Sequence, residues 1–113
     1  MNRDRAVTSL AALAQATRLE AFRQLVQSGP AGLAAGELAE RLGISPPALS
    51  FHLRGLAQAG LVRSRQQGRF VYYSAAFDAM QSLVEFLTEN CCGGAACAPA
   101  RTPVRKTTPR RIA

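Results

Sequence analysis

The stretch ELAERLGISPPALSFHLR, residues 37–54, decides the fold of this chain. Its first half predicts a short helix that ends at Leu42, because Gly43 suits the left-handed conformation that follows a helix end. Ser45 is a good N-cap, and Pro46 fits the first position of a second helix, where the backbone needs no amide partner. Two short helices joined by a tight turn predict a helix-turn-helix.

The second helix, which we expect to continue to about residue 59, is amphipathic. Leu49, Leu53 and Leu56 recur at helical spacing and predict its buried face. The opposite face is free and small enough to enter the major groove of DNA. The candidate DNA-binding residues of this region are Ser45, Pro47, Ala48, Ser50, Phe51, His52 and Arg54.

These side chains suit contacts with bases and phosphates. Arg54 can reach a phosphate or a guanine, and Ser50 and His52 can donate hydrogen bonds. Phe51 or Ala48 can contact a thymine methyl group. Two alternatives stay open: His52 can be a core histidine with one internal hydrogen bond, and Phe51 can pack under the segment that follows.

The composition of residues 61–74 differs from that of the helices before them and predicts a two-stranded hairpin. Strand-forming residues flank a basic segment in which Gly68 permits a turn. The candidate DNA-binding residues of the hairpin are Arg65, Gln67 and Arg69, although arginines here are also compatible with ordinary solvated charges. The order of tight turn, open helix face and basic hairpin favours DNA binding. We therefore predict a mainly α fold with a small β-hairpin, the winged helix-turn-helix.

Further helices are expected on both sides of this unit. Small and apolar residues predict a helix over 8–16. A second helix is expected to begin at Thr17, with Glu20 completing a capping box, and to stop before Gly29. Apolar residues at helical spacing predict a last helix over about 74–90.

Several of these stretches together resemble the ArsR/SmtB family of metalloregulators. The matching segments are AQATRL (14–19), ELAERLGIS (37–45), LSFHL (49–53), LAQAGLV (56–62) and GRFVYY (68–73). The resemblance covers roughly residues 10–90. It implies a homodimer formed by the first and last helices, and repression of an operon by the ligand-free protein until an inducer binds. A twofold dimer predicts an imperfect palindromic operator in double-stranded DNA.

The chain departs from the sensing sites that the family usually uses. Residues 32–38 and the N-terminal segment contain no cysteine, and His52 is the sole histidine. The resemblance is therefore to the arsenic-responsive subset whose site lies after the dimer helix, and it leaves Cys91, Cys92 and Cys97 as the candidate ligands. Three thiolates suit arsenite, or antimonite, whereas structural zinc usually takes four ligands.

Two other interpretations of the cysteines stay open. The thiols can form a disulfide and sense oxidants, or they can be incidental. The alternative function is accordingly a redox-responsive or ligand-independent winged-helix transcription factor. We expect no enzyme, because the sequence offers no acid–base pair, phosphate loop or nucleophile with a partner.

Composition sets the remaining expectations. The chain has 113 residues, room for one domain, and 48% of them are apolar. We expect residues 1–97 to form the DNA-binding and dimerisation domain with its cysteine segment, and 98–113 to be a disordered tail. That tail carries much of the net charge of +7 and suits nucleic acid, or merely solubility. With neither a leader nor an apolar run long enough for a membrane span, we expect a cytoplasmic protein.

Overall fold

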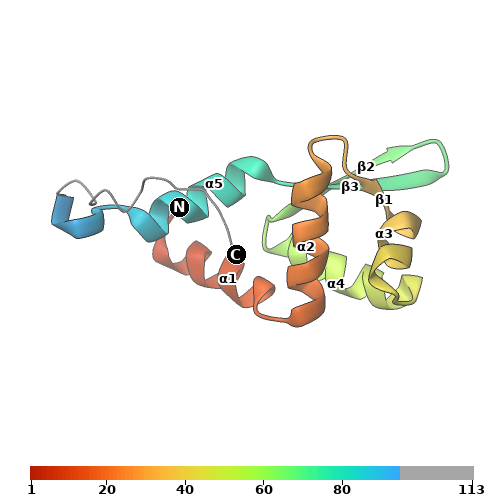
Figure 1. Ribbon diagram of the computed structural model, residues 1–113, viewed down its shortest axis with the longest axis horizontal. Coiled ribbons are helices and arrows are strands. Elements are labelled where there is room, and N and C mark those ends of the chain that lie inside the picture. The colour runs from red at the N-terminus through yellow and green to blue at the C-terminus, as the bar shows by residue number, and fades with distance from the viewer. Residues whose placement is uncertain (95–113) are drawn as a thin grey trace, which may run out of the picture.

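The computed structural model describes residues 1–94, which form five α-helices, a three-stranded sheet and one short 3-10 helix (Figure 1). In chain order the elements are α1 (Arg3–Leu13), α2 (Ala16–Ser28), β1 (Leu33–Ala34), α3 (Ala35–Leu42), α4 (Pro46–Gln58), β2 (Val62–Gln67), β3 (Phe70–Ala75), α5 (Phe77–Thr88) and the short 3-10 helix η1 (Cys91–Gly94). The fold is a winged helix-turn-helix, as predicted. The expected boundary at residues 97/98 lies outside the described residues.

The turn between α3 and α4 has the predicted local chemistry. Gly43 adopts φ 68° and ψ 32°, the left-handed conformation that ends α3. The Ser45 side chain then caps α4 by accepting a hydrogen bond of 3.3 Å from the Ala48 amide, and proline occupies the start of the helix. These contacts are local, and they set the angle at which α4 leaves α3.

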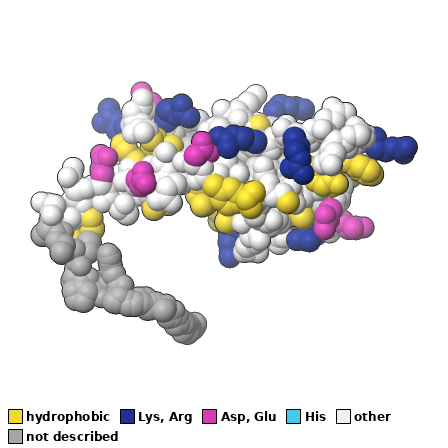
Figure 2. All heavy atoms as spheres, turned by 90° about the horizontal axis from the view of Figure 1, so that it is seen from above, with side chains coloured by type: hydrophobic (Ala, Val, Ile, Leu, Met, Phe, Trp, Pro, Cys, Tyr) yellow, Lys and Arg dark blue, Asp and Glu magenta, His cyan; other side chains and the backbone are white. Residues whose placement is uncertain are grey.

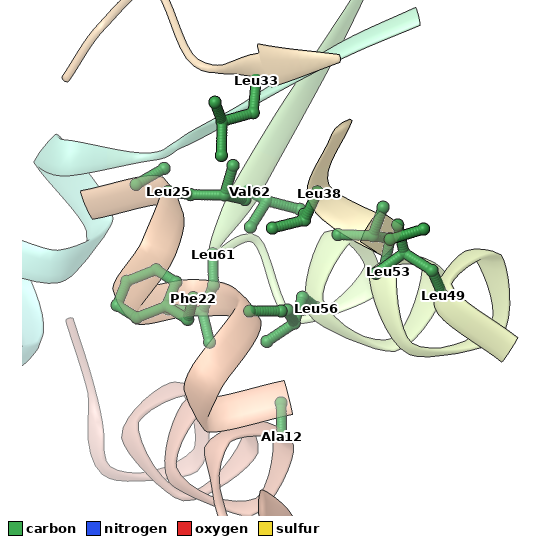
Figure 3. Packing of buried hydrophobic residues seen from close by; sticks show 13 residues of the cluster. Ala12, Phe22, Leu25, Leu33, Leu38, Leu49, Leu53, Leu56, Leu61 and Val62 are labelled. Carbon is green, nitrogen blue, oxygen red and sulfur yellow. The ribbon is translucent and has the colours of Figure 1, made fainter. Parts of the chain in front are cut away.

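The core lies where α2, α3, α4 and the sheet meet (Figure 3). The predicted stripe of α4 is almost fully buried, with Leu49 and Leu53 at 1% exposure and Leu56 at 0%. Leu25 of α2 and Leu38 of α3 pack against it at 0% exposure. Because this face of α4 is held by the core, its opposite face is turned to solvent.

The sheet contains a strand that the sequence did not predict. Strands β2 and β3 form the expected antiparallel hairpin, and the order of the sheet is β1-β3-β2. Leu33 of β1 pairs with Tyr73, and the preceding Gly32 has φ +73°. A Cβ at Gly32 would overlap the carbonyl group of Tyr73, so glycine is required for this close approach. A two-residue strand is too short to show alternation in a sequence.

Three helix boundaries differ from the prediction. The first helix starts at Arg3, because Asn2 caps it by accepting a 2.8 Å hydrogen bond from the Arg5 amide, and it ends at Leu13. The cap of α2 is Gln15, whose side chain accepts from the Arg18 amide at 2.8 Å, so the expected capping box at Thr17 is wrong. The last helix starts three residues late, because β3 continues to Ala75.

Helices α1 and α5 pack against each other and project away from the hairpin (Figure 1). Each leaves apolar side chains in solvent: Val7 and Leu10 on α1 are 59% and 42% exposed, and Val84 and Leu87 on α5 are 48% and 57% exposed. Within each pair the residues are three apart, so they share a helix face. No helix in residues 1–94 has the length and apolar content to cross a bilayer.

Candidate nucleic-acid interface

The solvent face of α4 carries most of the side chains expected to bind DNA. Pro47, Ser50, Phe51 and Arg54 are exposed, and the Phe51 ring stands out at 59%. Ala48 is half-buried. The helix therefore presents one cation, one hydroxyl and one aromatic ring on a surface that the core does not use.

Ser45 and His52 are placed differently from the other candidates on α4. The hydroxyl of Ser45 caps the helix, which uses one of its acceptor sites. His52 is half-buried, and its Nδ1 accepts a hydrogen bond of 3.3 Å from Nε of Arg18. The internal hydrogen bond considered for this histidine is thus present, while Nε2 is left for other partners.

Arg18 of α2 was missed as part of this surface. Its guanidinium carbon lies 5.6 Å from the centre of the Phe51 ring, and the rings of Phe51 and His52 meet edge-on at 5.5 Å. Phe51 therefore does not pack under the hairpin. The contact with His52 spans 34 positions in the chain, so no local pattern indicates it.

The hairpin supplies basic groups at the same end of the molecule (Figure 2). Gly68 and Arg69 form the two-residue turn at its tip, between the paired residues Gln67 and Phe70. Gln67 and Arg69 are exposed. Arg65 is more constrained: it donates to the Ala31 carbonyl at 3.1 Å, and its guanidinium carbon lies 4.9 Å from the ring centre of the cross-strand Tyr72.

The cysteine segment lies at the far end of α5. Cys91 and Cys92 are exposed, and their sulfur atoms are 3.6 Å apart. Asn90 and Cys92 have φ of 57° and 60°, so the backbone turns sharply after the helix. Cys97 lies outside the described residues. Within residues 1–94 no three His, Cys, Asp or Glu side chains gather as a metal site.

Known proteins with similar sequences are regulators of transcription. The profile of a family described as "Helix-turn-helix domain" matches residues 13–65. The transcriptional activator HlyU of Vibrio cholerae is 34% identical over 91 residues, which are 80% of this chain and 82% of HlyU. An ArsR-like transcriptional regulator from Rhodococcus, of known structure, is 31% identical with a TM-score of 0.69, over 80% of this chain and 83% of that one.

The chain belongs to the ArsR family of winged helix-turn-helix regulators. A solved structure of Mb0332 from Mycobacterium bovis is described as the homodimeric winged helix-turn-helix DNA-binding domain of a possible ArsR-family transcriptional regulator. It is 26% identical with a TM-score of 0.63, over 81% of this chain and 85% of that one. These relatives are regulators and not enzymes. The family resemblance derived from the sequence is thereby confirmed at the level of the ArsR family.

One arginine of the hairpin in this ArsR-family protein is held in an ion pair. Arg63 of β2 donates to both carboxylate oxygens of Asp78, at 2.8 and 2.9 Å. The hydrogen bond from Arg63 is the main cause that lowers the pKa of the Asp78 carboxyl, and the same bond raises the pKa of Arg63. This pair joins the base of the hairpin to the start of α5. The role of Arg63 is therefore structural.

Proposed function

We propose that this ArsR-family regulator is a homodimeric repressor that releases its operator when arsenite, or antimonite, binds to Cys91, Cys92 and Cys97. The observation that carries the DNA-binding part is the exposed face of α4 beside a hairpin with a basic tip. The observation that supports the inducer part is the 3.6 Å separation of two exposed sulfurs directly after α5.

The DNA-binding part follows from charge and shape. Arg54 on α4 and Arg69 at the hairpin tip are exposed cations on the two elements that enter DNA grooves in winged helix-turn-helix proteins. The apolar ring of Phe51 lies between the polar groups of α4 and suits a thymine methyl group. Phosphate contacts would supply affinity, and contacts from α4 would supply sequence preference.

The homodimer is supported by the apolar faces of α1 and α5. Val7 and Leu10 lie on one helix and Val84 and Leu87 on its neighbour, all more than 40% exposed. Covering such side chains removes apolar surface from water, at roughly 25 cal/mol for each Å². A second copy is the occupant with matching chemistry, since Mb0332 is described as homodimeric. Twofold symmetry then places two copies of α4 on an imperfect palindrome.

The sulfur geometry favours a shared ligand over a bond between neighbours. Zinc gives the scale of such a distance: two thiolates on one tetrahedral zinc ion, with bonds of about 2.3 Å, lie roughly 3.8 Å apart. The observed 3.6 Å fits two ligands of one soft ion. A disulfide between Cys91 and Cys92 fits less well, because adjacent Cα atoms are about 3.8 Å apart and disulfides usually need at least roughly 4.4 Å.

Arsenite matches this donor set by its chemistry. Arsenous acid exchanges its three hydroxyl groups for three thiol sulfurs and releases three water molecules. Cys97 is the third donor of the proposal. Glycines at 93 and 94 both have positive φ, a conformation that would allow the chain to turn sharply after the pair.

The position of the cysteines suggests how inducer binding reaches the DNA-binding face. Cys91 follows α5 by three residues, and Leu87 of the proposed dimer surface lies in the last turn of that helix. A ligand that holds this segment would therefore alter the end of a dimer helix. To change operator occupancy, binding must favour the non-binding arrangement by a coupling of about 1–3 kcal/mol or more.

Fluorescence anisotropy with a duplex from the chain's own promoter tests the proposal. Wild type should bind and should release the duplex when arsenite is added in a phosphine reductant, because dithiol reductants would chelate the arsenite. Cys91→Ser, Cys92→Ser and Cys97→Ser should bind the duplex like wild type and lose the response. If all three variants still release DNA, the proposed inducer site is wrong.

The same assay distinguishes the alternatives. A redox-responsive factor would release DNA on treatment with diamide and ignore arsenite under reducing conditions, and a ligand-independent factor would ignore both. Since HlyU is named as an activator, a promoter–reporter fusion should accompany the binding assay. Expression that falls when the gene is deleted would contradict repression while leaving operator binding intact.

A further inference from the structure

Arg18 sits at the junction between α2 and the exposed face of α4. It is half-buried, donates from Nε to His52 Nδ1 at 3.3 Å, and places its guanidinium carbon 5.6 Å from the centre of the Phe51 ring. Both partners belong to the face proposed to read DNA. From α2, the guanidinium therefore contacts two neighbouring side chains of α4, whose rings are themselves in edge-on contact at 5.5 Å.

Gly55 provides the space for this guanidinium. A Cβ at position 55 would lie 2.9 Å from the guanidinium carbon of Arg18 and 3.0 Å from one of its terminal nitrogens. Glycine inside a helix costs stability relative to alanine. Here the missing side chain allows an arginine of α2 to reach across α4, which accounts for a glycine in the middle of a helix with an ordinary backbone conformation.

We propose that Arg18 is a positioning residue for base readout: it fixes which hydrogen-bonding group His52 presents and holds the Phe51 ring in the exposed position. This inference rests on the proposed DNA-binding function. It assigns to Arg18 a role in distinguishing operator from other DNA, and no direct contact with phosphate.

The hydrogen bond with Arg18 determines which ring nitrogen of His52 carries the proton. A neutral imidazole carries one proton, and the nitrogen that accepts a hydrogen bond does not hold it. Since Nδ1 accepts from Arg18, the proton lies on Nε2, and His52 presents a donor. In the major groove a donor recognises the N7 atom of a purine, O6 of guanine or O4 of thymine, and it is mismatched with the amino groups of adenine and cytosine.

The contact with Phe51 has a parallel effect. A cation near an aromatic ring is attracted to it, and a fixed ring loses less conformational entropy when it meets a base. The ring is still 59% exposed, so it remains accessible to a thymine methyl group. Arg18 thus positions both His52, which is polar, and Phe51, which is apolar, for contacts with bases.

The test compares binding to the promoter duplex with binding to a scrambled duplex of the same composition. Arg18→Met removes the charge and the donor, Arg18→Lys keeps the charge, and Gly55→Ala keeps the arginine but displaces its guanidinium. The last variant also raises helix propensity, and the added Cβ displaces only the end of a flexible side chain, so we expect the domain to stay folded. Arg23→Lys is the matched control, because Arg23 lies on the same helix and makes only an exposed pair with Glu20 at 3.8 Å.

We expect all variants at 18 and 55 to lower the ratio of specific to non-specific affinity by about ten-fold, since a good base contact discriminates by roughly five-fold to more than a hundred-fold. The dependence of affinity on salt should stay unchanged, and Arg23→Lys should behave like wild type. In long-range ¹H–¹⁵N spectra of the free protein, the sole imidazole should carry its proton on Nε2, and the Nδ1 signal should move in Gly55→Ala.

Three results would overturn the inference. A salt slope that falls in Arg18→Met and is restored in Arg18→Lys would identify a phosphate contact. Equal losses on both duplexes, together with a lower melting temperature, would identify a purely structural role. An unchanged affinity ratio in Gly55→Ala, with its Nδ1 signal moved, would separate the hydrogen bond from base readout. A wild type that fails to distinguish the two duplexes would instead overturn the proposed function itself.

Discussion

Replacing Arg69 at the hairpin tip should weaken DNA binding in a way that salt reveals. Arg69 is exposed in a two-residue turn, where Gly68 with φ +65° lets the chain reverse. In the proposed complex with DNA, a tip in that position would reach the phosphate backbone. We therefore expect Arg69→Ala to remove one phosphate contact from each subunit, and two from the dimer.

The magnitude follows from counterion release. Each neutralised phosphate contributes about −0.9 to the slope of log affinity against log salt, so two lost contacts flatten the slope by about 1.8. Between 50 and 200 mM salt, a four-fold change, wild type should then lose about twelve times more affinity than Arg69→Ala. Anisotropy titrations of the promoter duplex at four or more salt concentrations measure this slope directly.

Arg63→Ala is the matched control on the same strand pair. Its guanidinium is bound to Asp78, and it lies roughly 15–20 Å along the hairpin from the tip. The control should keep the wild-type slope. If Arg69→Ala keeps that slope as well, the hairpin tip does not contact phosphate, and the wing must be removed from the proposed DNA interface.

Other changes test separate parts of the molecule. Leu87→Glu places a charge on the apolar face of α5 and should convert the proposed dimer to a monomer in light scattering. Promoter affinity should fall by more than ten-fold, because one subunit reads only half of a palindrome. A dimer that persists would place the interface elsewhere. Wild type should bind a duplex with thymine more tightly than the same duplex with deoxyuridine, which lacks the methyl group, and Phe51→Ala should abolish this preference. If wild type binds the two duplexes equally, the Phe51 ring does not contact a thymine methyl group. The Arg63 hydrogen bond lowers the Asp78 pKa in the folded state, so its stabilisation is present above the unfolded pKa and is lost as pH falls through the folded value. Urea midpoints of wild type and Asp78→Asn should therefore differ at pH 6 and begin to converge only below about pH 4, the ordinary pKa of an aspartate. A gap that stays constant as the pH falls further would contradict the ion pair.

Local chemistry explains why so much of the fold was predictable. The left-handed Gly43, the Ser45 cap and the leucines of α4 act over four residues or fewer, and each has the predicted conformation or burial. The turn at Gly68 belongs to the same class. Where local signals competed, the prediction failed: Thr17 and Gln15 are both able to cap α2, and only the structure shows that Gln15 does so.

In the candidate site, too, local patterns predicted some features and only the structure showed the others. Exposure of Ser50, Phe51 and Arg54 follows from the amphipathic pattern of a single helix, so the sequence was sufficient to place them on one face. The proximity of Cys91 and Cys92 is inherent in their adjacency, whereas the sharp backbone turn and the 3.6 Å between their sulfurs required the structure. The expectation for Cys97 stays a prediction.

The sequence by itself determined the class of protein: which helix turns a polar face to solvent, where the hairpin turns and which thiols are candidate ligands of a soft ion. Tertiary structure alone decided how those groups are held. Arg18 meets His52 across 34 residues, Gly32 admits a strand against Tyr73, and Arg63 pairs with Asp78. The physical reason is range: capping and periodicity depend on neighbours within one or two helical turns, whereas these contacts exist only after helices and strands pack together.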